Sequence, residues 1–258
     1  VPLLAVAVSS VMPDSLRDAT NAMALESLAE FKLVLPGVDE AREKSVTAML
    51  KRLYHEQLRD PIVDAGQETL DLLDTLNRMD PGGYKPESGA TYPNSELGNG
   101  LRQVAFLAKA QVGLEVAFLD RGGWDTHVAQ GSSTGYMAIG LQDVAESLAA
   151  FSKDLGEEMR RTTVVVMTEF GRRLQENGGL GTDHGRGSAM FVLGGGAKGG
   201  KVHGKWPGLE PDDLDEVGDL RVTTDYRDVL AEILSVRVKG TDIAAVFPGH
   251  RVQPVGIC

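Results

Sequence analysis

Short apolar runs that alternate with segments of helical length are the feature that most restricts the fold of this chain. One run covers residues 114–119, another covers 164–166, and the segment at 136–160 between them has helical character. A further apolar run follows at 189–193. Because parallel strands need a crossover of about helix length, this alternation indicates βαβ units. The sequence therefore predicts an α/β fold with a mainly parallel sheet flanked by helices.

The other segments fit one domain of this class. A chain of 258 residues is long enough for one large domain, and we expect residues 1–258 to form it. Residues 1–8 are predicted to be a first strand. Residues 39–79 are rich in helix formers with apolar residues near helical spacing, which predicts a helical arm that Pro61 kinks or divides. Glycines and prolines at 80–100 predict a long loop.

Charge and hydropathy restrict the partners of the chain. The formal net charge is -11, from 26 basic and 37 acidic side chains, and such a balance repels nucleic acid and anionic membranes. We therefore expect no nucleic-acid partner. No apolar run approaches the roughly 20 residues that a membrane-spanning helix needs. The single cysteine, Cys258, excludes an internal disulfide.

Carboxylates and histidines follow the apolar runs, two of them in a glycine-rich turn. The candidate metal ligands are Asp125, His127, Asp183, His184 and His203. Ligands placed after the carboxyl ends of parallel strands meet at one edge of a sheet, so we expect these side chains to converge. Histidine with carboxylate suits zinc, and carboxylates also accept manganese or magnesium. The alternative is that these side chains only stabilise their turns by hydrogen bonds.

Two charged residues after the run at 164–166 are candidate catalytic groups. Glu169 suits a metal ligand, a general base or an ion-pair partner of a nearby arginine. Arg172 suits a clamp for an anionic group or the neutralisation of the carboxylates. The sequence leaves these alternatives open. It lacks the G-x-S-x-G elbow of a Ser-His-Asp hydrolase, and its glycines at 194–200 do not match a phosphate-binding loop.

Five segments resemble the bacterial Domain of Unknown Function 1501 family. They are GGWDTH at 122–127, TEFGR at 168–172, ENGGLGTDHGRG at 176–187, GGKVHGKWPGL at 199–209 and TTDYRDVL at 223–230. That family is placed with the alkaline phosphatase and sulfatase-like superfamily, whose α/β fold carries two metals. The resemblance thus implies an alkaline-phosphatase-like fold and hydrolysis of phosphate or sulfate esters, with metals stabilising the attacking and leaving oxygens.

The resemblance also implies roles for particular residues. Asp183 and His184 resemble one pair of metal ligands, and Asp125 and His127 resemble the other, although the wider group spaces that pair farther apart. His203 resembles a late histidine ligand. Zinc is the expected metal, with manganese or magnesium as alternatives, and a small anionic ester is the expected substrate.

Family members begin with an export signal and an early strand, with another Asp and the nucleophile in that early part. None of this precedes Val1. We therefore expect the later portion of an exported, periplasmic or cell-surface protein, with the N-terminal part of the fold and the nucleophile outside this chain. The missing segment or another chain would complete the fold, and the oligomeric state stays open. The alternative to a hydrolase is a non-catalytic exported binding or assembly protein that keeps the fold.

Overall fold

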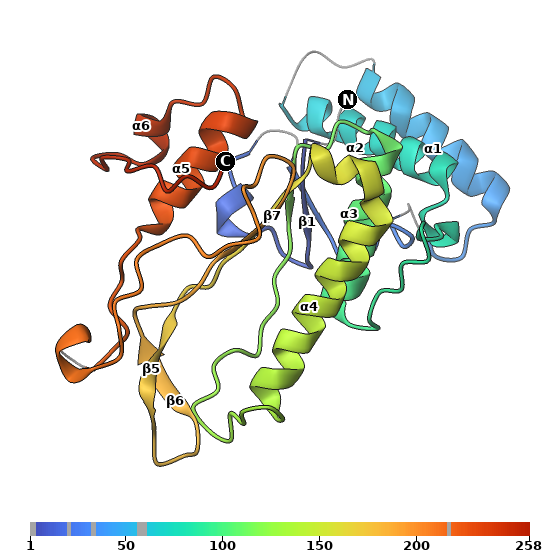
Figure 1. Cartoon of the computed structure of the whole chain (residues 1–258). Coiled ribbons are helices and arrows are strands. Elements are labelled where there is room, and N and C mark those ends of the chain that lie inside the picture. The colour runs from blue at the N-terminus through green and yellow to red at the C-terminus, as the bar shows by residue number, and fades with distance from the viewer. Residues whose placement is uncertain (1–3, 20–21, 32–34, 56–60, 216–217) are drawn as a thin grey trace. The chain divides into compact units, whose positions relative to one another are not determined.

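The computed structural model describes residues 4–19, 22–31, 35–55, 61–215 and 218–258 (Figure 1). The chain divides into two compact units. The first unit is Val1–Gly122 with Asp143–Gly156, and the second unit is Gly123–Gln142 with Glu157–Cys258. Short 3-10 helices lie at Asp14–Leu16, Pro81–Gly83, Gly156–Arg160 and Pro211–Asp213.

A three-stranded parallel sheet forms the centre of the first unit. Strand β1 (Ala5–Val8) pairs with β2 (Ala22–Leu25) on one side and with β3 (Val116–Phe118) on the other. Val6 and Ala7 of β1 have no exposed surface, as expected for a short apolar strand at the centre of a sheet. The predicted α/β class is confirmed. Of the first strand predicted at 1–8, residues 1–3 lie outside the described residues.

Two helices occupy the range for which the helical arm is predicted. They are α1 (Glu40–His55) and α2 (Pro61–Met79), which contact each other. Helix α2 begins at Pro61, where the missing N–H removes no intrahelical hydrogen bond. The predicted range therefore holds two helices, and the second of them begins at the proline.

Helix α3 (Glu96–Ala110) packs closely against the parallel sheet. Ser95 caps its start by accepting a hydrogen bond from the Gly98 N–H. A Cβ at Gly100 would lie 2.6 Å from the end of the Leu119 side chain, so a larger residue here would require that side chain to shift. The core of the unit joins helices to sheet through Val6, Leu25, Leu28, Leu72, Leu76, Phe106 and Leu107.

Asp154, near the end of α4 (Tyr136–Leu155), is a fully buried carboxylate. It accepts hydrogen bonds from the hydroxyls of Tyr84 (2.9 Å) and Tyr92 (2.8 Å) and from the Glu87 N–H (2.8 Å). Lys109 Nζ lies 2.8 Å from it. Burial alone would raise the pKa of Asp154, but these donors together hold it below its usual value. The network ties α4 to α3 and to the loop at 84–92.

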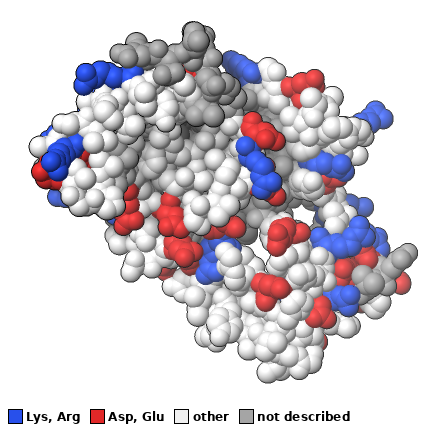
Figure 2. Space-filling view, turned by 180° about the vertical axis from the view of Figure 1, so that it is seen from behind, with Lys and Arg blue, Asp and Glu red and all other residues white. Residues whose placement is uncertain are grey.

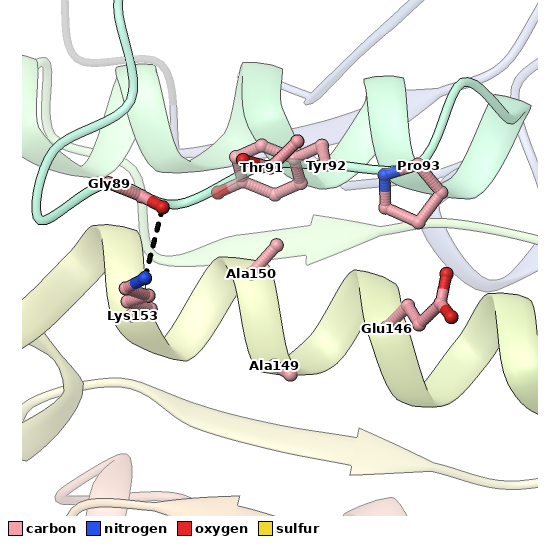
Figure 3. A pocket seen from close by; sticks show the side chains of 8 residues that line it. All are labelled: Gly89, Thr91, Tyr92, Pro93, Glu146, Ala149, Ala150 and Lys153. Atoms are coloured by element: carbon pink, nitrogen blue, oxygen red, sulfur yellow. Dashed lines mark hydrogen bonds between the residues drawn. The ribbon is translucent and has the colours of Figure 1, made fainter.

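An open pocket of about 420 Å³ lies beside this network in the first unit. Figure 3 shows Ala149, Ala150 and Lys153 of α4 on one side and the loop residues up to Pro93 on the other. Lys153 Nζ donates to the Gly89 carbonyl at 3.0 Å. This contact holds the loop at 84–95 against α4. The loop is shorter than the range 80–100 predicted for it, because a 3-10 helix occupies Pro81–Gly83 and α3 begins at Glu96.

The second unit contains two antiparallel strand pairs. Strand β4 (Thr163–Val166) pairs with β7 (Phe191–Gly194), and β5 (Gly171–Glu176) pairs with β6 (Thr182–Gly185). This corrects the expectation of a mainly parallel sheet for the runs at 164–166 and 189–193. The connection between β4 and β7 is the β5–β6 hairpin instead of a helix, so the chain returns in the opposite direction.

The C-terminal part of the second unit packs on helix α5 (Tyr226–Arg237), which is followed by the short helix α6 (Ile243–Val246). Val229, Ile233 and Ile257 form a buried cluster against residues of β4 and β7. The Glu232 carboxylate accepts hydrogen bonds from three backbone N–H groups of the last residues, Val255, Gly256 and Cys258. These contacts hold the end of the chain on α5.

On the face drawn in Figure 2, lysine and arginine side chains lie among acidic ones. Within the described residues, no helix combines the length and apolarity needed to cross a membrane.

Candidate metal centre

The turn after β3 lies against the β5–β6 hairpin, about fifty residues further along the chain. The Ala129 N–H donates to the Gly179 carbonyl at 2.9 Å, and the Gln130 N–H donates to the Leu180 carbonyl at 3.0 Å. Val128 and Leu180 form an isolated antiparallel bridge next to these two hydrogen bonds. Backbone pairing therefore brings the Asp125–His127 segment to the hairpin that carries Asp183 and His184.

Side chains reinforce this pairing. The hydroxyls of Thr126 and Thr182 donate to the same Gln130 oxygen, at 3.0 and 2.7 Å. A Cβ at Gly181 would lie 2.4 Å from the carbonyl carbon of His127, so the two segments approach this closely only with glycine at that position.

Arg172 of β5 makes hydrogen bonds to both segments. Its guanidinium donates to the Trp124 carbonyl and, at 2.5 Å, to the Thr182 carbonyl. Nη2 also lies 3.5 Å from Asp125 Oδ1. Of the two roles left open by the sequence, these contacts match the neutralisation of a carboxylate, because the guanidinium is directed at backbone oxygens and at Asp125.

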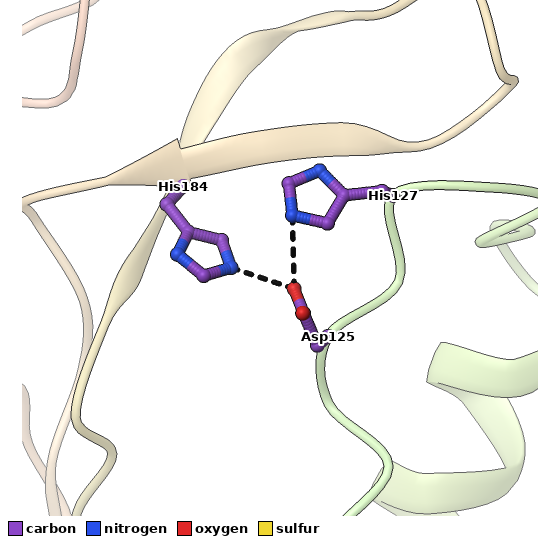
Figure 4. A group of neighbouring side chains, drawn as sticks. All are labelled: Asp125, His127 and His184. Carbon is purple, nitrogen blue, oxygen red and sulfur yellow. Dashed lines mark hydrogen bonds and ion pairs between the residues drawn. The ribbon is translucent and has the colours of Figure 1, made fainter.

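Asp125, His127 and His184 converge on one point (Figure 4). Oδ1 of Asp125 lies 2.6 Å from His184 Nε2 and 3.0 Å from His127 Nε2. One ligand atom from each residue lies within 4.8 Å of the others. The rings of His127 and His184 stack with their centroids 4.8 Å apart. The Phe170 ring stacks on the His184 ring, with 4.2 Å between centroids. The aromatic stack restricts the orientation of His184.

Both carboxylates of this region favour their charged form. A hydrogen bond from His184, with further contributions from His127 and Arg172, lowers the pKa of Asp125. The pKa of Asp183 is lowered first by a hydrogen bond from Asn177 and then by His127. Each carboxylate is therefore an ionised acceptor at neutral pH.

The structure places the remaining candidates elsewhere. Asp183 Oδ1 lies 3.1 Å from His127 Nδ1, so this carboxylate contacts the ring nitrogen opposite to the one that faces Asp125. His203 Nε2 donates to the Lys198 carbonyl at 3.0 Å, and this histidine is not one of the three converging residues. Glu169 is exposed on the connection between β4 and β5.

Sequence reasoning did not single out Asn177, Phe170 or Gln130. Asn177 precedes two glycines, a pattern typical of a tight turn, and that signal marks the end of the hairpin. Nothing in the sequence marks the aromatic stack of Phe170 or the shared acceptor of Gln130, because both depend on how distant segments pair.

The three converging residues suit a divalent cation. One carboxylate and two imidazoles form a ligand set that zinc uses in catalytic sites, where a further coordination position stays open. The side chains of Asp125, His127 and His184 are 60%, 43% and 47% exposed, which leaves such a position accessible. Ligand atoms of a tetrahedral zinc lie about 3.4 Å apart. The distances from Asp125 Oδ1 to Nε2 of His184 and of His127, 2.6 and 3.0 Å, must therefore lengthen by roughly 0.4–0.8 Å when zinc binds.

Comparison with known proteins places the chain in a family. The model of the family described as "Protein of unknown function (DUF1501)" matches residues 35–255. The chain belongs to this family, and the predicted family membership is confirmed. Searches of curated proteins and of solved structures found no match.

Proposed function

We propose that this protein is a metal-dependent hydrolase of phosphate or sulfate esters, with a fold of the alkaline phosphatase type. The observation that carries the proposal is the convergence of Asp125, His127 and His184 from two segments that are far apart in the sequence. Turn stabilisation alone would not require two imidazole nitrogens to approach the same carboxylate oxygen.

The chemistry of the site supports an anionic ester as substrate. A divalent cation bound here would supply Lewis-acid polarisation of an ester oxygen. Asp125 provides the negative charge that holds a cation, while Arg172 sits 3.5 Å from it and offsets part of that charge. The aromatic stack of Phe170 and His184 holds one imidazole in place. The exposure of all three side chains leaves room for a substrate oxygen.

Metal analysis and ester hydrolysis on matched variants test the proposal. The protein is expressed together with the N-terminal part of the fold that the family resemblance implies, purified, and dialysed against zinc, manganese or magnesium. Its metal content is measured, and turnover of p-nitrophenyl phosphate and p-nitrophenyl sulfate is followed. We expect Asp125→Ala and His184→Ala to lose both bound metal and turnover. His203→Ala is the control, because His203 contacts a backbone carbonyl outside the cluster.

The outcomes separate the proposal from its alternative. A protein that binds no divalent metal, or whose hydrolysis is unchanged in Asp125→Ala, contradicts the proposal. A protein that binds metal at these residues and hydrolyses neither ester supports a non-catalytic binding role.

A further inference from the structure

The two ring nitrogens of His127 have different carboxylate neighbours. Nδ1 makes a hydrogen bond with Asp183 Oδ1 at 3.1 Å. Nε2 approaches Asp125 Oδ1 at 3.0 Å, and that oxygen already has a hydrogen bond of 2.6 Å with His184. A neutral imidazole carries one proton, and only its unprotonated nitrogen binds a metal. Which nitrogen keeps the proton therefore decides whether His127 is ready to bind a cation beside Asp125.

Asn177 is a hydrogen-bond donor to the Asp183 carboxylate. Asn177 Nδ2 donates to Asp183 Oδ1 at 2.9 Å and to the His127 carbonyl at 3.0 Å. The orientation of the Asn177 amide is fixed by chemistry. The N–H groups of Gly179 and Gly181 both point at its other atom, at 2.8 and 3.2 Å, and only an oxygen accepts from an N–H. The amino group must therefore face Asp183.

These contacts form a chain from the hairpin turn to the histidine. The turn amides fix the Asn177 oxygen, the Asn177 amino group holds Asp183 Oδ1, and that oxygen is placed to accept the Nδ1–H of His127. A metal-binding histidine commonly donates its other N–H to a carboxylate, which fixes the tautomer and the ring orientation.

We propose that Asn177 is a positioning residue that acts through Asp183 to hold His127 as the Nδ1–H tautomer, with Nε2 left for the cation. Only the consequence of this tautomer, that Nε2 of His127 binds the cation, rests on the proposed function. The tautomer itself is a property of the metal-free protein.

The substitution Asn177→Asp separates the two roles of this side chain. An aspartate keeps an oxygen acceptor for the Gly179 and Gly181 N–H groups and so preserves the turn. It replaces the amino group by a second carboxylate oxygen next to Asp183. The two like charges repel, which should turn Asp183 Oδ1 away from Nδ1 of His127 and leave Asp125 as the acceptor of the ring proton. Gln175→Glu is the matched control, because Gln175 is exposed on β5 and the change adds the same charge to the same hairpin.

The tautomer is read from long-range ¹H–¹⁵N correlation spectra of the imidazoles in the metal-free protein, at a pH where they are neutral. The signals of His127 are those missing from His127→Gln. We expect Nδ1–H in the native protein and in Gln175→Glu, and Nε2–H in Asn177→Asp. Zinc affinity in competition with a chelator should fall roughly 10–100-fold in Asn177→Asp, the usual effect of losing such a partner, and stay unchanged in Gln175→Glu.

Several results would overturn the inference. One is Nε2–H in the native protein, and another is an unchanged tautomer in Asn177→Asp. If Asn177→Asp does not fold, Asp183→Ala keeps the turn intact and should also give Nε2–H; an unchanged tautomer there overturns the inference too. If the native protein holds Nδ1–H under the control of Asn177 but binds no zinc, the positioning role stands and the metal-dependent function fails.

Discussion

Removal of the buried Asp154 carboxylate should destabilise the first unit strongly. In Asp154→Ala, the hydroxyls of Tyr84 and Tyr92 and the N–H of Glu87 lose a buried acceptor. Lys109, with 16% of its side chain exposed, keeps Glu87 Oε1 at 3.3 Å and the Tyr84 ring, whose centroid is 5.7 Å from Nζ. Breaking a buried ion pair from one side costs about 3–5 kcal/mol. That is a large share of the roughly 5–15 kcal/mol that stabilises a typical domain.

The assay must report on the first unit. Both tryptophans, Trp124 and Trp206, belong to the second unit, so urea unfolding is followed by far-UV circular dichroism of the helices and by amide hydrogen exchange. Two variants calibrate the result. Tyr92→Phe removes one hydrogen bond to a charged group and should cost about 1.5–3 kcal/mol. Asp18→Ala at an exposed position should stay within about 0.5 kcal/mol. A loss below about 1 kcal/mol in Asp154→Ala would refute the reasoning.

Three further predictions follow from the contacts described above. Burial raises the pKa of Tyr84 to about 12, so the folded state keeps a proton that the unfolded chain loses near pH 10. Stability should therefore fall between about pH 10 and 12. Tyr84→Phe should make this fall smaller in alkaline unfolding curves, and Tyr92, whose pKa burial also raises, should supply the part that remains. Gly181→Ala places a Cβ 2.4 Å from the His127 carbonyl carbon, so we expect zinc binding, measured by competition with a chelator, to be lost. Arg172→Lys cannot donate in a fork to the Trp124 and Thr182 carbonyls and should weaken zinc binding in the same assay, whereas an unchanged affinity would show that Arg172 does not hold the site together.

The sequence predicted the elements better than their pairing. The apolar runs at 114–119 and 164–166 contain β3 and most of β4, because burial leaves a hydrophobic signal. The β5–β6 hairpin gives no such signal, since most of β5 is exposed and polar. Without that hairpin, the antiparallel return to β7 could not be predicted from the sequence.

The residue types of the site were predictable, and their contacts were not. Asp125, His127 and His184 stand out as ligand types after apolar runs, and the structure brings them together. Asp183 and His184 were expected to share a turn that lets both reach one site. They lie instead in strand β6, where successive side chains point to opposite faces. His184 therefore meets Asp125 while Asp183 meets His127 from the other side.

The most direct test of the metal site is an anomalous difference map at the zinc absorption edge, from crystals grown with zinc. We expect a peak roughly 2.0–2.2 Å from a carboxylate oxygen of Asp125 and from Nε2 of both His127 and His184. A map with no peak there, in which the two imidazoles still contact Asp125 directly, would contradict it.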